Sequence, residues 1–244
     1  MRTIEKTVAI LIVALAAWAI LMSLATSFRG SQSNRILLVE LGSDAASLNL
    51  AVQADGSSDR DGVAHNIRMM VRNTYLDFVF ILLYWLTFVS LAGLAGLLGQ
   101  RILAVFAALA ISFAAIADLL ENHAILVAMG VGDFTDPVAV DISECSQAKW
   151  AFFFLASVLL GLAFALNRRS STMRRATGGI FVAGGAFGIL GIARYGVELE
   201  FAIIMINIGL ALVAVALLLS LWKLVQSLKA LGQHEDAHHV HAHA

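Results

Sequence analysis

Six apolar runs of 16 to 21 residues constrain the fold of this chain more than any other feature of its sequence. They cover residues 8–24, 78–98, 102–120, 150–166, 178–193 and 201–221, and only the third holds a charged side chain, Asp118. A helix needs ~20 residues to cross a hydrocarbon core of about 30 Å. We therefore expect an all-α integral membrane protein, with six transmembrane helices bundled in a single polytopic domain, residues 1–244, that is surrounded by the lipid bilayer.

The composition agrees with a membrane protein and excludes several other classes. Hydrophobic residues make up 60% of the chain and charged residues 14%, whereas about 25% of a soluble domain is charged. A formal net charge of −1 gives no basis for binding nucleic acid. The single cysteine, Cys145, rules out an intrachain disulfide and a Cys-rich zinc site. No GxSxG, HExxH, Walker A or GxGxxG pattern indicates an enzyme chemistry.

The distribution of Lys and Arg predicts that both termini lie in the cytoplasm. With the N-terminus inside, the inner segments hold nine basic and three acidic residues. The outer segments hold seven basic and fourteen acidic residues when Asp118, at the outer end of the third span, is counted with them. The short segment 168–175, with four arginines, carries most weight because the bias is strongest in short loops. We expect span 8–24 to be an uncleaved signal anchor. The single proline and short loops favour a bacterial inner-membrane protein with periplasmic long loops.

Two of the segments that we expect outside the membrane are long, residues 25–77 and residues 121–149. In the outer loop, residues 25–77, Ser43 and Asp44 are suited to cap a short helix. Farther along, the pattern predicts an amphipathic interfacial helix just before the second span. Its apolar face, opposite Arg68 and Arg72, holds Val63, Ile67, Met70, Val71 and Thr74. The second segment, residues 121–149, is expected to hold no large fold of its own.

The C-terminal tail, residues 232–244, holds five of the seven histidines. A His-rich tract can bind zinc, nickel or copper. The tail is short, and nothing in its sequence fixes a coordination geometry. We expect a cytoplasmic tail without a metal and assign no metal site elsewhere.

Polar residues near the outer ends of four spans fall on faces that we expect to pack inward. In the third span Asp118, Glu121 and Asn122 share a side with the alanines, and small residues mark close helix packing. We expect these faces to line an outward-opening acidic cavity with Arg194 as its main counter-charge. The predicted ligand-binding residues are Asp77, Tyr84, Asp118, Glu121, Asn122, Arg194, Glu198, Glu200 and Asn207.

Three functions fit this pattern, and the residues alone leave them open. The favoured hypothesis is an outer-face site for a cation, or for a small polar or lipid headgroup ligand. A second is an enzyme that acts on lipid at the outer leaflet through Asp118 and Glu121. A third is an accessory or assembly subunit, which contacts a partner or a second copy through the face with Gly184, Gly188 and Gly191. A plainer alternative is that the polar residues form salt bridges at the membrane surface.

Overall fold

The computed structural model describes residues 2–26, 35–53, 60–131, 134–167, 171–195 and 198–242, with side chains described between residues 3 and 228. Within these ranges the chain is helical, without a strand. The helices are α1 (Arg2–Ala25), α2 (Arg35–Leu41), α3 (Ala45–Val52), α4 (Arg60–Leu97), α5 (Arg101–Val131), α6 (Asp136–Ala165), α7 (Thr172–Arg194) and α8 (Leu199–Ala242). All except α2 and α3 are long and apolar enough to cross a membrane, which confirms an all-α protein with six candidate spans.

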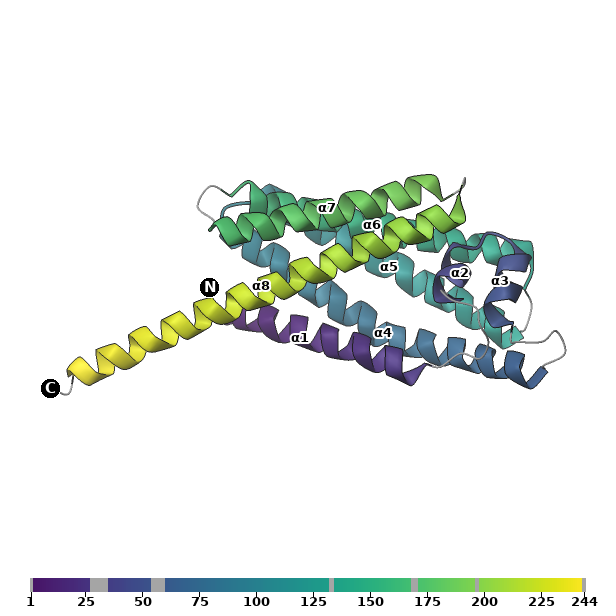
Figure 1. Cartoon of the computed structure of the whole chain (residues 1–244), viewed down its shortest axis with the longest axis horizontal. Helices are drawn as coiled ribbons and strands as arrows, with labels where there is room; N and C mark the ends of the chain where they lie inside the picture. The colour runs from purple at the N-terminus through teal and green to yellow at the C-terminus, as the bar shows by residue number, and fades with distance from the viewer. Residues whose placement is uncertain are drawn as a thin grey trace.

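The six long helices pack largely in chain order. Each helix from α4 to α7 packs on the helix that follows it, so that α4 contacts α5 and α7 contacts α8 (Figure 1). Helix α1 packs on α4 and α8. The short helices α2 and α3 lie at one end of the bundle, where both contact α6. We call this the capped end, and we call the opposite end, where α1 begins and α8 leaves the bundle, the terminal end (Figure 1).

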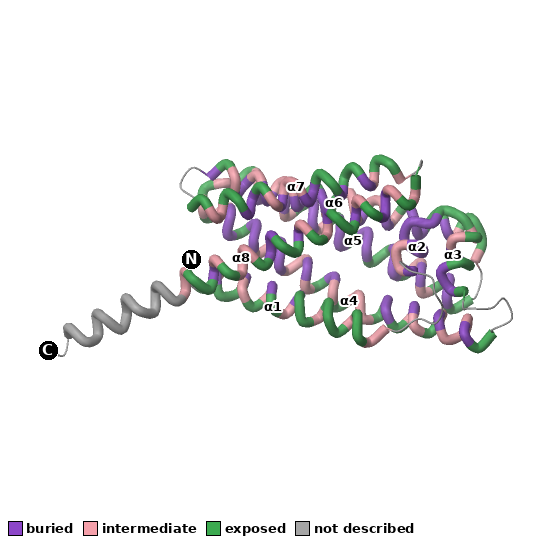
Figure 2. The backbone as a smooth tube through the Cα atoms, viewed as in Figure 1, coloured by how far each residue is buried: buried purple, intermediate pink, exposed green. Residues whose placement is uncertain are grey.

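Helix α5 has small residues on its buried face and bulky apolar residues on its exposed face. The small residues Ala104, Ala107 and Ala114 are buried in the central hydrophobic core. The bulky Phe106 and Phe113 are exposed on the other side of the same helix. Figure 2 shows this division between buried and exposed faces along each long helix. The prediction that the alanine side of the third span packs inward is therefore confirmed, and bulky side chains are left on the surface that suits lipid.

Helices α2, α3 and the first part of α4 make up most of the described part of the long outer loop. Asp44 caps α3, as predicted, because its carboxylate accepts a hydrogen bond of 2.7 Å from the Ser47 backbone N–H. This hydrogen bond lowers the pKa of Asp44. Helix α4 starts at Arg60 and continues into the second span without a break, over ~57 Å.

The predicted amphipathic segment forms the first part of α4. Met70 is buried there, and Val63, Ile67 and Val71 pack around it in a second hydrophobic core shared with α2, α3, α5 and α6. Arg68 and Arg72 are exposed, as the pattern predicts. Because the apolar face contacts protein, packing accounts for it, and a position at the membrane surface stays a prediction.

Residues 121–149, for which we expect no large fold of their own, form the ends of two long helices rather than an irregular loop. Helix α5 continues to Val131, and α6 begins at Asp136 with Pro137 in its first turn, where a missing N–H is tolerated. The two helices continue to pack on each other beyond their apolar runs. Hydropathy marks the part of a helix that suits hydrocarbon, whereas interhelical packing decides where the helix ends.

Candidate functional site

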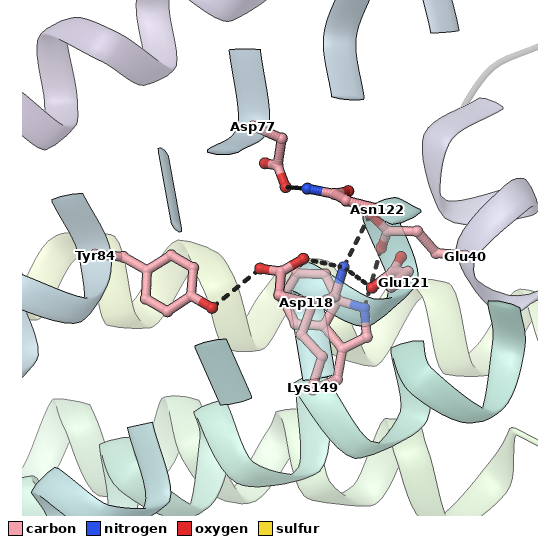
Figure 3. A network of polar contacts seen from close by, with 8 residues as sticks. Glu40, Asp77, Tyr84, Asp118, Glu121, Asn122 and Lys149 are labelled. Atoms are coloured by element: carbon pink, nitrogen blue, oxygen red, sulfur yellow. Dashed lines mark hydrogen bonds and ion pairs between the residues drawn. The ribbon is translucent and has the colours of Figure 1, made fainter. Parts of the chain in front are cut away.

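The ammonium group of Lys149 lies at the centre of a cluster of carboxylates near the capped end (Figure 3). Its Nζ is 2.6 Å from Oε2 of Glu121, 3.1 Å from Oε1 of Glu40 and 3.4 Å from Oδ1 of Asp118. Lys149 comes from α6, Glu40 from α2, and Asp118 and Glu121 from α5. The cluster is enclosed, since Lys149 is 6% exposed and Glu121 is 0% exposed. We call these four residues the lysine cluster.

Two further hydrogen bonds and a cation–π contact orient the charged groups of the lysine cluster. Tyr84 donates its hydroxyl hydrogen to Oδ2 of Asp118 at 3.0 Å. The indole N–H of Trp150 donates to Oε2 of Glu40 at 3.1 Å, and the Lys149 ammonium lies 4.7 Å from the centre of the same Trp150 ring. These contacts hold the ammonium and the carboxylates in place. A buried ion pair needs such additional contacts because removing its charges from water is costly.

Asp77 extends the network beyond the lysine cluster. Its Oδ2 accepts a hydrogen bond of 2.9 Å from the Asn122 side-chain amide, and Asn122 follows Glu121 on α5 (Figure 3). Asp77 forms no ion pair with any residue that the structure describes. Its only described polar contact is therefore a neutral amide.

The network has more carboxylates than cations. In the part of the chain that the structure describes, the network holds four carboxylates and one ammonium group, that of Lys149, which leaves three negative charges if every group ionises. Among the described residues, Oε1 of Glu121 has no hydrogen-bond partner. Burial raises the pKa of the Glu40 carboxyl, although the Lys149 ammonium opposes this. Uncompensated buried charge is costly, so the network favours uptake of protons or of a cation.

A cavity of about 490 Å³ lies beside this network, a volume typical of small-molecule sites. Glu40, Asp77, Asn122 and Trp150 reach it from the network, while Asp118, Glu121 and Lys149 do not line it. The rest of its wall comes mainly from α1, α2, α4 and α8: Ala19, Met22, Ser23, Thr26, Ile36, Leu37, Val39, Met70, Asn73, Thr74, Phe80, Ile125, Asn207 and Leu210. The lining of the cavity thus combines two carboxylates, Glu40 and Asp77, with mainly apolar residues.

The structure brings together only some of the residues proposed from the sequence. Asp77, Tyr84, Asp118, Glu121 and Asn122 form one network. Asn207 lines the cavity on the α8 side without a described bond to that network.

Arg194, Glu198 and Glu200 are exposed around the turn between α7 and α8. They line neither the cavity nor the network. The prediction that Arg194 is the main counter-charge is therefore wrong. Arg194 is the last residue of α7 and its side chain is exposed, whereas Lys149 is the cation that pairs with the carboxylates.

The sequence does not single out two members of the cluster, Glu40 and Lys149. Glu40 lies in the outer loop, residues 25–77, and Lys149 ends the segment 121–149 just before the fourth span. Lys149 could have been found by extending the helical pattern of the fourth span backwards along the chain. Ile142, Ser146 and Lys149 then fall on one face, which is the buried face of α6. No comparable pattern marks Glu40, because α2 has only seven residues.

The structure also bears on metal binding and on the glycine face. No three His, Cys, Asp or Glu side chains in the described part of the chain are placed to hold a metal ion, and the histidines of the tail lie outside the described side chains. Gly184 and Gly191 pack against α8, and Gly188 packs against the ring of Phe154 in α6. These glycines serve packing within the chain, so a partner would need another surface.

Comparison with known protein families, with curated proteins and with solved structures finds no match to this chain.

Proposed function

We propose that this protein binds a small amphiphile with an ammonium head group in the cavity beside the lysine cluster. We further propose that it is a bacterial inner-membrane protein with cytoplasmic termini, so that the capped end and the cavity face the periplasmic side. The observation that carries the binding proposal is the cavity of about 490 Å³ whose lining includes the carboxylates of Glu40 and Asp77 together with apolar residues.

The head-group chemistry follows from the charges. The space among Glu40, Asp118 and Glu121 is filled by the ammonium of Lys149, so a ligand cation cannot take that position. Asp77 lines the cavity and has a neutral amide as its only described partner. Asp77 is half-buried, so a cation beside it would compensate a negative charge that water solvates only in part, and its N–H groups would form charge-assisted hydrogen bonds.

The apolar part of the ligand follows from the apolar residues of the lining. Met22 of α1, Phe80 of α4 and Leu210 of α8 line the cavity and suit a hydrocarbon tail. Residues of α1 and α8, two of the candidate membrane spans, line the cavity. This supports access from the bilayer, where an amphiphile would already be dissolved.

The test uses an ammonium probe and a neutral probe with the same chain. Protein purified in a neutral maltoside detergent is titrated with dodecylammonium or dodecanol at submicellar concentration, and the melting temperature and native mass spectrum are recorded. We expect dodecylammonium to bind and raise Tm, and dodecanol to do so much less. In Asp77→Asn we expect about tenfold weaker binding of dodecylammonium, from the loss of one charge-assisted contact.

Asp141→Asn is the matched control, because Asp141 is an exposed carboxylate on α6 outside the cavity. It should bind dodecylammonium as the wild type does. An equal response of wild type and Asp77→Asn would overturn the proposal, as would equal binding of the two probes. Either result would favour the accessory-subunit hypothesis and direct the search to protein partners.

A further inference from the structure

A second group of polar residues lies at the terminal end, away from the lysine cluster. A small hollow of about 30 Å³ opens there among α4, α6, α7 and α8. Its lining residues are Leu91, Leu94, Phe164, Arg174, Thr177, Ser220, Lys223 and Leu224. The hollow is too small for a whole ligand, so it would receive only one end of a larger molecule.

The charges of this hollow are all positive. Arg174 and Lys223 line it, and no carboxylate does. Neither of the two forms an ion pair or a side-chain hydrogen bond with any residue that the structure describes. Two cations converging without a described counter-ion favour a bound anion.

The two hydroxyl groups that line the hollow help to define which anion would bind there. Thr177 donates its hydroxyl hydrogen to the Met173 carbonyl, and Ser220 donates to the Ala216 carbonyl, each at 2.9 Å. Both donors are therefore occupied within their own helices. The free hydrogen-bond donors of the hollow are those of Arg174 and Lys223, which suit an anion with several acceptor oxygens, such as a phosphate group.

The surroundings fit a lipid as the source of that phosphate. Leu91, Leu94 and Phe164 give the hollow an apolar floor. Trp222, next to Lys223, is 59% exposed, and exposed tryptophans are typical of the depth at which head groups lie. Arg174 belongs to the first turn of α7, whose positive end of the helix dipole adds to the attraction.

We propose that Arg174 and Lys223 bind the phosphate group of an anionic membrane phospholipid at the terminal end of the bundle. The site is independent of the cavity at the capped end, since the two share no lining residue. Basic hollows between spans are a recurring mode of anionic lipid recognition.

The experiment compares three probes on the whole chain. Purified protein is titrated with short-chain phosphatidylglycerol, short-chain phosphatidylcholine or inorganic phosphate, and bound lipid is counted by native mass spectrometry. We expect phosphatidylglycerol to bind in preference to phosphatidylcholine. In Arg174→Gln/Lys223→Gln we expect phosphatidylglycerol binding to weaken about tenfold or more, because two charge-assisted contacts are lost.

Two further variants keep the test decisive. Arg101→Gln removes an exposed arginine at the start of α5 and should bind phosphatidylglycerol as the wild type does. Arg174→Lys/Lys223→Arg keeps both charges and should retain most of the binding even if the glutamine variant folds poorly. Full binding by a folded glutamine double variant would overturn the proposal, as would loss of binding in the charge-preserving variant. If inorganic phosphate at equal concentration displaces all bound phosphatidylglycerol, the proposal of a lipid ligand is overturned, and the site is one for free phosphate.

Discussion

Lys149 is the residue on which the buried charges depend. Its ammonium contacts three carboxylates, and Glu121 has no exposed surface through which water could solvate it. Removing one partner of a buried ion pair is far more destabilising than replacing the whole pair by neutral groups, because the remaining charge stays buried without compensation.

We predict that Lys149→Met destabilises the protein by about 3–5 kcal/mol. The double variant Lys149→Met/Glu121→Gln should recover part of that loss, since Glu121→Gln removes the charge left closest to the empty position. Thermal unfolding in detergent, followed by circular dichroism, measures both variants. If the double variant is less stable than Lys149→Met alone, the ion pair does not account for the stability, and packing around the lysine chain does.

At the scale of helices, glycine contacts fix how closely neighbouring spans approach. Gly161 of α6 and Gly178 of α7 face each other, and a Cβ built on either would lie 2.6 Å from the carbonyl oxygen of the other. Gly179 is the next residue of α7, and a Cβ there meets nothing within 4 Å. Two adjacent glycines thus have opposite roles, one in the helix contact and one facing outward.

We predict that Gly178→Ala destabilises the protein by about 1–3 kcal/mol, because the obstructing atoms belong to backbone and can yield only if the helices separate. Gly179→Ala should be neutral or slightly stabilising, since alanine is the better helix former. Melting temperatures of the two variants, purified side by side, provide the measurement. Equal destabilisation by both would mean that this contact does not set the distance between α6 and α7.

The whole molecule has two ends that differ in charge and shape. The acidic network and the cavity lie near the capped end, and the basic hollow lies at the terminal end. The lysine and arginine distribution predicts that the terminal end faces the cytoplasm.

Labelling of single cysteines tests this orientation. In a Cys145→Ser background we expect Asp141→Cys to react with a membrane-impermeant maleimide in intact spheroplasts. Thr172→Cys should react only after the membrane is permeabilised. Both positions are exposed, and they lie near the starts of α6 and α7, which begin at opposite ends of the bundle. The reverse pattern would invert the topology and place the cavity on the cytoplasmic side.

Local sequence determined the membrane class, the six apolar helices, the inward face of α5 and the cap of α3. Each of these depends on hydropathy, periodicity or a capping residue within a few turns of one helix. For the same reason Asp77, Asp118, Glu121 and Asn122 could be assigned to inward faces, since a helix carries residues three or four apart on one side.

Only the tertiary structure decided which charges meet. Glu40 and Trp150 are 110 residues apart in the chain, yet their side chains are hydrogen-bonded. Lys149 became the counter-charge, rather than Arg194, because α6 continues beyond its apolar run and turns Lys149 towards α2 and α5. The register and rotation of one helix against another are set by side-chain packing across the whole bundle. Periodicity along a single helix carries no information about that packing, so the partner of each carboxylate had to come from the fold.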